Sequence, residues 1–416
     1  MKNVFLVGNG FDLHHMLPSQ YFDFLCVAEQ LSNNSLFFPL TAGTVLSQCK
    51  VSPNIQRCYE AHKDVFDNID LPNNEIIELI ELVNDNLWFS FFSKTLSRSL
   101  GWIDFEKEIF SVITVIGNML NQNQDKIILP VDDQLSSFIL SFFKFFIVPC
   151  DNLVIHPGAS LQIRSEYLIE TLYNSGIYRI NKEKVYEKLH RELFNFCKAL
   201  KIYFKCFIED ALSALSKDSY ITNNAIGIMD HSDIVISFNY TSTCEQFYSN
   251  QTVYHIHGTI NNGNIVLGLN PSDADDKGGA DTSQIKFKKY YQRVVYETDL
   301  EYINWYRENV LNKNEYRLIV IGHSLDETDK DILADVFLNA KEIFVTYYNE
   351  DSKNSYIANI VKIFGKLGFD SFIRDQHLQF IPLSAIDSLK SKIKPEEIPW
   401  SVSKTGFDYG EVINPI

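Results

Sequence analysis

The segment Gly8-Asn9-Gly10-Phe11-Asp12 directly follows an apolar run and has the composition of a phosphate-binding turn. Glycine permits a tight turn and lets the backbone approach a phosphate, and a helix that starts there would point free N–H groups at it. Leu13 stands where a complete dinucleotide fingerprint has its third glycine. On its own, the segment therefore fits a dinucleotide phosphate cradle and an ordinary strand-to-helix turn about equally well.

Asn239 follows a second apolar run, 234–238, at the start of a polar turn. In an open α/β sheet, ligands bind beyond the carboxyl ends of the strands, which makes Asn239 a candidate catalytic residue. The commoner role of asparagine at such a place is that of a turn residue. The residues alone leave both roles open.

His255 and His257 belong to the next apolar run and, being two residues apart, would share one face of a strand. Two histidines can bind a metal, but no carboxylate or cysteine accompanies them at a useful spacing, so we expect no metal site. His257 is followed by Gly258 just past the strand end, where a histidine can serve as a general base. A lone histidine is more often structural, so this role also stays open.

The segment Gly322-His323-Ser324-Leu325 follows a fourth apolar run. It partly matches the Gly-x-Ser-x-Gly nucleophile elbow of α/β-hydrolases, but Asp326 stands where that motif needs its closing glycine. A serine hydrolase that acts through Ser324, with His377 downstream as its partner, is therefore a minor alternative.

Strands that alternate with helices must position these segments. Short apolar runs predict strands at residues 3–7, 233–237, 252–256, 264–268, 317–321 and 342–346. Helical spacing of apolar residues predicts helices between several of them, at 287–311, 327–338 and 352–367. Such alternation is typical of a parallel sheet covered on both faces, and so of an α/β fold.

The stretch between the first strand and the others is mostly helical in pattern, notably at 74–96, 105–120 and 182–215. We therefore expect a sheet core of residues 1–18 and 226–393, a helical insertion domain of 19–225, and an irregular C-terminal tail of 394–416. The most apolar stretch, 138–148, is too short to span a bilayer and is expected to be a buried helix. The insertion is also a candidate for self-assembly and for sensing a trigger.

The composition limits the expected partners. Lys plus Arg number 37 and Asp plus Glu 53, so the net charge is −16, and such a chain repels nucleic acid and anionic membranes on average. The seven cysteines include no CxxC pair, which argues against a zinc ribbon and fits a reducing compartment. The N-terminal apolar run is too short for a signal peptide, so we expect a cytoplasmic protein without a membrane partner.

The order of these segments resembles the bacteriophage abortive infection AbiH family. The resemblance rests on the glycine-rich segment at residue 8 and on Tyr21-Phe22-Asp23-Phe24, Trp102-Ile103-Asp104-Phe105-Glu106, Phe238-Asn239-Tyr240, His255-Ile256-His257-Gly258 and Ile321-Gly322-His323-Ser324-Leu325-Asp326. These motifs are spread over most of the chain. Their joint order is much more specific than any one of them.

The AbiH family in turn is similar to the SIR2-like superfamily. This resemblance implies a Rossmann-like parallel sheet of SIR2 type with a large helical insertion, and NAD as the ligand. It also implies that the segment from Gly8 to Asp12 holds the phosphates and that Asn239 and His257 are catalytic. Gly258 and the segment Gly322-His323-Ser324-Leu325 would complete the nucleotide site.

Two departures from the sirtuin deacylases point to another reaction. This chain lacks their zinc ribbon, and Thr241 stands where they carry an aspartate beside nicotinamide. The resemblance thus implies an antiphage defence effector, a hydrolase that cleaves the nicotinamide–ribose bond of NAD without a metal. Because the aspartate is missing, a nucleotide-binding sensor or toxin module without turnover is the alternative. The expected partners are NAD or a related nucleotide, a second copy of the chain and a phage-derived trigger.

Overall fold

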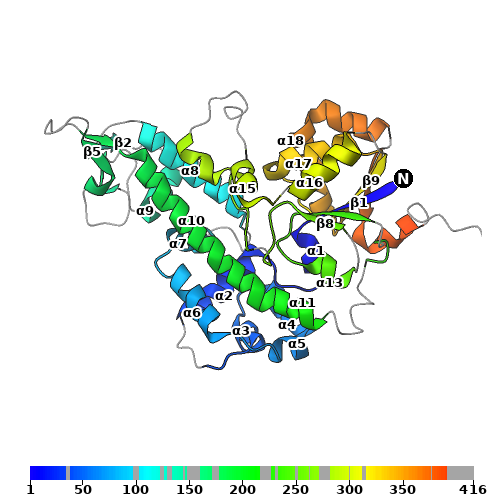
Figure 1. Cartoon of the computed structure of the whole chain (residues 1–416), viewed down its shortest axis with the longest axis horizontal. Helices are drawn as coiled ribbons and strands as arrows, with labels where there is room; N and C mark the ends of the chain where they lie inside the picture. Colours follow the sequence, from blue (N-terminus) through cyan, green and yellow to red (C-terminus); the bar gives the residue numbers. More distant parts are fainter. Residues whose placement is uncertain are drawn as a thin grey trace, which may run out of the picture.

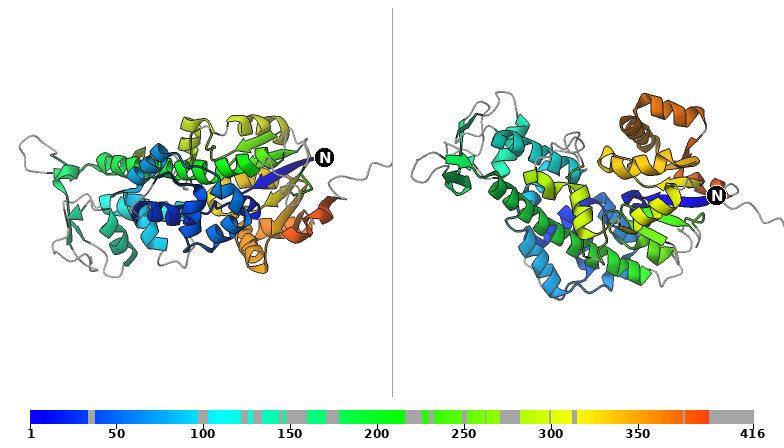
Figure 2. Two further views of the ribbon diagram at one scale, coloured as in Figure 1. Left: turned by 90° about the horizontal axis from the view of Figure 1, so that it is seen from below. Right: turned by 45° about the horizontal axis from the view of Figure 1, so that its top comes forward.

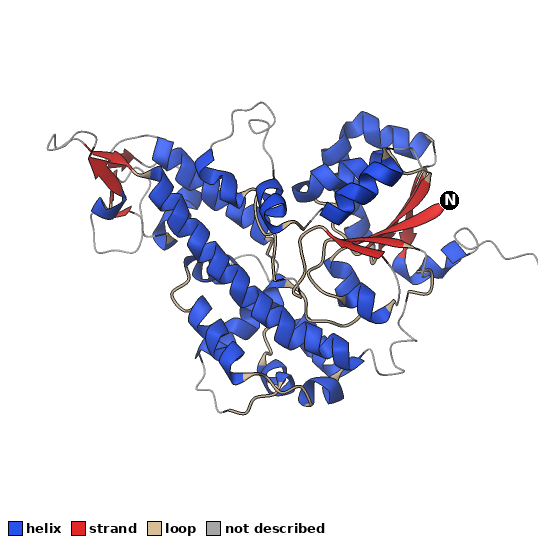
Figure 3. Ribbon diagram, in the orientation of Figure 1, coloured by secondary structure: helices blue, strands red, loops and turns tan. Residues whose placement is uncertain are grey.

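The computed structural model describes residues 1–33, 38–96, 103–121, 126–128, 134–143, 146–147, 160–170, 178–215, 226–229, 233–248, 252–261, 263–270, 282–298, 300–311, 315–375 and 377–390. Figure 3 shows the main sheet at one side of the molecule and a larger body of helices beside it. The long helix α10 (Lys182–Phe204) runs through this helical body (Figure 1). The predicted tail, 394–416, lies outside the described residues.

Six parallel strands form the main sheet, in the order β11-β10-β9-β1-β7-β8. They are β1 (Lys2–Val7), β7 (Ile234–Ser237), β8 (Thr252–His255), β9 (Tyr316–Ile321), β10 (Glu342–Tyr347) and β11 (Leu378–Pro382). The chain builds outward from β1 to β7 and β8, and then adds β9, β10 and β11 on the other side of β1. This is the α/β arrangement of doubly wound dinucleotide-binding folds, and the strand order reverses between β1 and β9.

Both faces of the central strands of the sheet are buried. Val4 and Leu6 of β1 face a cluster that includes residues of α16 (Leu300–Trp305), α17 (Lys330–Leu338) and α18 (Glu350–Arg374). In the right-hand view of Figure 2, the yellow and orange helices of this group lie above the blue strand β1. Phe5 and Val7 face the opposite cluster, which includes residues of α1 (Asn9–His14), α13 (Thr243–Phe247) and η6 (Leu383–Leu389). Burial on both faces is the reason that β1 is apolar from Val4 to Val7 rather than alternating.

Most of the described chain between β1 and β7 is helical. The helices are α2 (Tyr21–Asn33), α3 (Ala42–Gln48), α4 (Pro53–Ala61), α5 (Lys63–Asp67), α6 (Asn73–Val83), α7 (Leu87–Leu96), α8 (Phe105–Asn121), α9 (Gln134–Phe142), α10 and α11 (Asp210–Leu215). A π-helical turn, η2 (Lys205–Glu209), joins α10 to α11. Two small antiparallel sheets consist of β2 (Lys126–Ile128), β3 (Phe146–Ile147) and β4 (Ser160–Ile163), and of β5 (Leu168–Glu170) and β6 (Tyr178–Ile180).

One apolar cluster fills the helical body and extends to the sheet. Phe92 stacks on Phe105 at a centroid distance of 4.4 Å, and Phe196 packs edge-on against both rings. The same cluster includes Tyr240, which follows β7, and Leu267, which follows β8. The helical body therefore packs directly on the loops at the carboxyl ends of these strands.

Residues 264–268 do not form a strand, although their apolar run predicts one. The Val266 amide donates to the His257 carbonyl, and both the amide and the carbonyl of Leu267 bond to the side chain of Gln292. A side-chain amide thus makes the hydrogen bonds that a neighbouring strand would make. The prediction was wrong because burial alone does not distinguish a strand from such a loop.

Two further predictions need correction, and one strand was not predicted. The helix predicted over 287–311 is broken after α15 (Lys289–Tyr296) by Glu297, whose φ of 55° is left-handed. The buried helix predicted over 138–148 ends at Phe142, and β3 follows it. The sequence does not predict β11, because its run ends in proline, which an edge strand tolerates.

Within the described ranges, no helix combines the length and the apolarity that a membrane crossing requires. The domain boundaries predicted at residues 18, 225 and 393 stay predictions.

Candidate functional site

A pocket of about 390 Å³ opens at the carboxyl edge of the sheet, where the loops after β1 and β9 meet. Small-molecule sites have volumes of roughly 300–1,000 Å³. Nine of the residues that the sequence singles out line this pocket: Gly8, Asn9, Gly10, Asp12, Asn239, His257, Gly322, His323 and Ser324. Phe11, Gly258 and Leu325 are buried and do not line it.

The glycines of the two loops pack backbone against backbone. A Cβ atom on Gly10 would lie 2.7 Å from the Cα atom of Gly322, and one on Gly8 would lie 2.7 Å from the Cα atom of His323. Gly322 also has a left-handed φ of 67°. The close approach of the loops therefore requires these glycines whether or not a phosphate lies over them.

Hydrogen bonds within and between these loops occupy several of their amides. The Gly10 N–H donates to the Gly322 carbonyl at 2.8 Å, and the Phe11 N–H donates to the Gly8 carbonyl at 2.8 Å. The Gly8 N–H donates to the Ile321 carbonyl at 3.2 Å. The turn therefore offers a phosphate fewer free N–H groups than its sequence suggests.

The side chain of Asn239, directly after β7, is held by its amide nitrogen. Nδ2 donates to the Gly8 carbonyl at 3.0 Å and to Asp12 Oδ1 at 3.2 Å. Because both amide hydrogens are used, Oδ1 is the atom left to meet a ligand. Asn239 can thus accept a hydrogen bond from a hydroxyl group or a water molecule in the pocket.

Asp12 is buried beside Asn239 and also accepts a hydrogen bond from Thr241 Oγ1 at 2.7 Å. Burial raises the pKa of Asp12 to about 7, and the hydrogen bond from Thr241 opposes this rise. Asp12 thus brings a carboxyl group from α1 to the turn after β7, a contact that the sequence alone does not show.

His257 is buried, and its Nε2 lies 3.0 Å from Asp329 Oδ1. Asp329 Oδ1 lies away from the direction in which a proton on Nε2 would point, so Nε2 makes no aligned hydrogen bond within the described part of the chain. Burial lowers the pKa of His257 to about 4, with a further contribution from the charge of Lys289. The ring is therefore neutral near pH 7, as a proton acceptor must be.

His323 faces the same aspartate. Its Nδ1 accepts the Leu325 N–H at 2.9 Å, so in the neutral ring Nε2 carries the proton. That Nε2 lies 3.6 Å from Asp329 Oδ2. Asp329 therefore faces both histidines of the pocket, one with each carboxylate oxygen.

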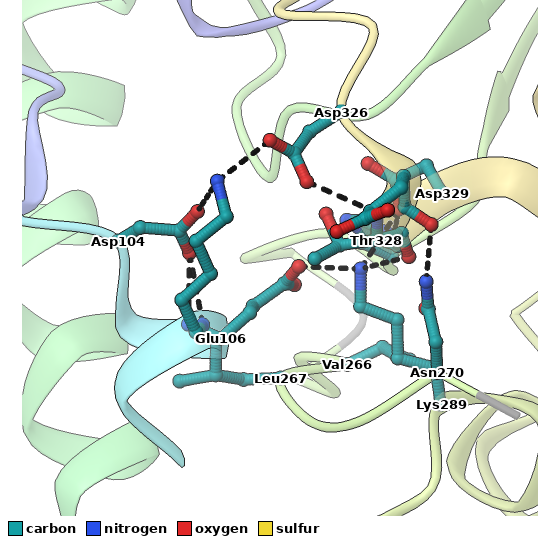
Figure 4. Close-up of polar contacts among 12 residues, drawn as sticks. Asp104, Glu106, Val266, Leu267, Asn270, Lys289, Asp326, Thr328 and Asp329 are labelled. Atoms are coloured by element: carbon teal, nitrogen blue, oxygen red, sulfur yellow. Dashed lines mark hydrogen bonds and ion pairs between the residues drawn. The ribbon is translucent and has the colours of Figure 1, made fainter. Parts of the chain in front are cut away.

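Asp329 also belongs to a buried ion network with Lys289 and Glu106, which Figure 4 shows. Lys289 Nζ lies 2.8 Å from Asp329 Oδ1 and 2.7 Å from Glu106 Oε2. Burial alone would raise the pKa of Asp329, but the charge of Lys289 holds it well below its ordinary range. Burial raises the pKa of Glu106 to about 8, against the opposing effect of Lys289. The network joins α8, α15 and the short helix η5 (Glu327–Asp329).

A second ion pair joins the same elements at the rim of the pocket. Lys107 Nζ lies 2.7 Å from Asp326 Oδ2 and 3.2 Å from Asp104 Oδ2. Two successive residues of α8, Glu106 and Lys107, thus connect the helical body to the segment after β9.

Ser324 lines the pocket but lacks the partners of a serine nucleophile. Its hydroxyl bonds to no histidine among the residues that the structure describes. His377 directly precedes β11, and so lies at the amino edge of the sheet, whereas Ser324 follows β9 at the carboxyl edge. Strands of this length separate the two edges by roughly 15–20 Å. The pairing of Ser324 with His377 is therefore wrong.

His255 does not join His257 in the pocket. Its Nε2 lies 2.7 Å from Glu245 Oε1, and its Nδ1 lies 2.9 Å from the Asn239 carbonyl oxygen. In the described ranges, no three His, Cys, Asp or Glu side chains are grouped so that they could hold a metal ion.

Four residues for which the sequence predicts no role lie in or against the pocket: Lys289, Asp329, Glu106 and Tyr21. Tyr21 and Glu106 fall within motifs of the AbiH resemblance, which is the signal that could have found them. Lys289 carries no such signal, because a lysine in the first turn of a helix is typical of an exposed surface.

The model of the family described as bacteriophage abortive infection AbiH matches residues 4–348 of the chain. Neither a curated protein nor a solved structure gives a significant match. The matched part extends from β1 through β10, and it contains the histidines, the ion network and both glycine loops. The match supports a role in abortive infection, a defence against bacteriophage. Because it covers most of the chain, the protein belongs to the bacteriophage abortive infection AbiH family.

Proposed function

We propose that this AbiH protein is an abortive-infection effector that hydrolyses the nicotinamide–ribose bond of NAD. The observation that carries the proposal is that Asn239, His257 and both glycine loops meet in one pocket. This pocket lies where the strand order reverses, which is the place where doubly wound sheets bind dinucleotides. The pyrophosphate would lie over Gly8 and Gly10, and the adenosine against the segment 322–325, as the SIR2-like resemblance implies.

The proposed reaction adds water across the bond between ribose C1′ and the nicotinamide nitrogen. This bond breaks with its electron pair passing to the nitrogen, which loses its positive charge and leaves as neutral nicotinamide. Oδ1 of Asn239 accepts a hydrogen bond from the attacking water or a ribose hydroxyl, and His257 takes the proton of the water as its oxygen bonds to C1′. The products are nicotinamide, ADP-ribose and a proton.

The buried carboxylate of Asp329 would assist the bond cleavage. Positive charge develops on the ribose as nicotinamide departs, and fixed negative charges nearby stabilise it. Asp329 stays ionised at neutral pH, since Lys289 holds its pKa low. The pocket therefore needs no metal ion to support the charge of this transition state.

The test is to incubate the purified full-length protein with NAD and to measure nicotinamide release by chromatography, with and without extract of phage-infected cells. We expect Asn239→Ala and His257→Ala to lower the rate by about 100-fold or more, because each removes a group that contacts the reacting atoms. Normal turnover by both variants would refute the assignment of these residues.

Two matched variants serve as controls. Asn339→Ala changes an exposed asparagine that follows α17, and His377→Ala changes a histidine at the other edge of the sheet. Both are expected to keep the wild-type rate. Calorimetric binding of NAD without product under any condition would instead support a nucleotide sensor without turnover.

A further inference from the structure

We propose that Asp329 and Lys289 are positioning residues for His257, with Asp329 holding one ring nitrogen and Lys289 holding Asp329. The inference rests on the proposed role of His257, which is the residue that meets the substrate. Neither positioning residue needs to touch the substrate itself.

The geometry fixes the Asp329 carboxylate from several sides. Oδ1 lies 3.0 Å from His257 Nε2 and 2.8 Å from Lys289 Nζ, and Oδ2 faces His323. Lys289 in turn lies 2.7 Å from Glu106 Oε2 and donates to the Thr328 carbonyl at 3.1 Å. With these three groups around it, the carboxylate has little freedom to turn away from His257.

This arrangement selects one form of the imidazole ring. A carboxylate next to Nε2 favours the tautomer that carries its proton there, and Nδ1 is then the nitrogen that accepts a proton. In the ligand-free protein, His257 Nε2 and Asp329 Oδ1 lie close together but are not aligned as a hydrogen bond. Catalytic hydrogen bonds are often poorly aligned before the ligand is bound, and a small rotation of the ring would align this one.

Lys289 also controls the charge of the ring. The groups that act on His257 are Asp329 from η5, Lys289 and Arg293 from α15, with Glu106 from α8 and His323 near the network. Burial and the positive charge of Lys289 keep the ring neutral, and the negative charge of Asp329 opposes them. The Lys289 side chain is only 1% exposed, and a buried ammonium group lowers the free energy of unfolding unless it is paired. The buried lysine is tolerated because it keeps His257 neutral and so able to accept a proton.

The decisive measurement is the titration of His257 by NMR, with ¹³C- and ¹⁵N-labelled histidine in the full-length, ligand-free protein. His257→Gln assigns the signal. We expect Lys289→Met to move the titration midpoint of His257 upward by about one pH unit or more, since a nearby positive charge disfavours the imidazolium. Lys289→Arg keeps the charge and should keep the wild-type midpoint.

The matched control is Lys341→Met, which removes an exposed lysine paired with Glu315. It should leave the His257 signal unchanged. An unchanged midpoint in folded Lys289→Met would overturn the role of Lys289. Should Lys289→Met fail to fold, the charge-preserving Lys289→Arg and the isosteric Asp329→Asn remain informative.

Asp329→Asn tests the other half of the proposal. The ¹⁵N shifts of His257 should change from one fixed tautomer, protonated at Nε2, to a mixture of both. A wild-type ¹⁵N pattern in this variant would overturn the positioning role of Asp329. These spectra need no turnover, so they judge the inference even if the protein proves unable to hydrolyse NAD.

Where turnover is measured, the kinetics give a second readout. Asp329→Asn should lower kcat by about tenfold or more with little change in KM, because proton transfer to His257 and the charge on the ribose both belong to the transition state rather than to substrate binding. Lys289→Met should move the acid limb of the pH–rate profile upward in step with the NMR midpoint. A rate loss in Lys289→Met without this movement would indicate a merely structural role.

Discussion

At the scale of single residues, the role of Asp12 depends on the side chains that surround it in the fold. The sequence places it in a candidate phosphate cradle, where a carboxylate would repel the ligand. The structure instead puts its oxygens against Nδ2 of Asn239 and the hydroxyl of Thr241. Asp12 therefore orients the candidate catalytic asparagine. Its type and position could be read from the sequence, but this task depends on residues more than 220 positions away.

Asp12 also makes the stability of the protein depend on pH. Its pKa is about 7 in the folded protein, against an ordinary value of 3.8. Between these values, rising pH removes its proton from the unfolded chain but not from the folded one, so the free energy of unfolding falls. We expect this fall to be smaller in Asp12→Asn, by up to about 4 kcal/mol, from 1.36 kcal/mol for each pKa unit.

The measurement is urea denaturation followed by tryptophan fluorescence, at pH 4.5 and pH 7.5. Asp351→Asn, at an exposed position in the first turn of α18, is the control and should retain the wild-type pH dependence. The same pH dependence in Asp12→Asn and in the wild type would show that Asp12 is ionised in the folded protein throughout this range.

At the scale of elements, the strands that carry the site could be predicted because each is buried on both faces. Their carboxyl ends place Gly8, Asn239 and Gly322 at one edge, and that much of the pocket follows from the sequence. The ion pairs of Lys289 could not be predicted, since they join three elements that only the tertiary fold brings together. The loop at 264–268 was misassigned for a related reason, because its hydrogen-bond partner is a side chain of α15.

Gln292 is therefore expected to be essential for this loop. Its side chain bonds to the amide of Leu267 at 2.9 Å, to the carbonyl of Leu267 at 3.1 Å and to the carbonyl of Lys286 at 3.0 Å. Gln292→Leu leaves these backbone groups without partners, which should lower the free energy of unfolding by about 1–3 kcal/mol. Thermal denaturation measures the effect, with Gln48→Leu, at an exposed position of α3, as the control. Equal loss of stability in both variants would contradict this role.

At the scale of the whole molecule, the pocket is shared between the sheet and the helical body. Gly8, Asn239 and Gly322 come from the ends of strands, whereas Tyr21 and Glu106 come from α2 and α8. The helical body is therefore one wall of the site, in addition to any role in sensing or assembly. A change in how it packs on the sheet would reach His257 through Glu106, Lys289 and Asp329 in turn.

Because the sheet and the helical body both line the pocket, we expect a bound ligand to slow amide hydrogen exchange in both. With ADP-ribose as the probe, amide protection should increase in segments 8–13 and 322–329, which follow strands β1 and β9. It should also increase in segments 19–24 and 103–108 of the helical body. Segment 77–82 of α6, which does not line the pocket, is the internal reference. Protection confined to the sheet segments would show that the helical body does not enclose the ligand.

The place of β1 in the sheet has a consequence for the synthesis of the protein. Among the strands of the main sheet, β1 is synthesised before the others, yet its two neighbours, β7 and β9, begin about 230 and 310 residues later. At translation rates of about 5–20 residues per second, the strand waits at least roughly ten seconds for its first partner and longer for its second. Throughout this time the two glycine loops cannot meet, so a nascent chain has no pocket. The pocket can therefore form only after the segment that follows β9 has been made.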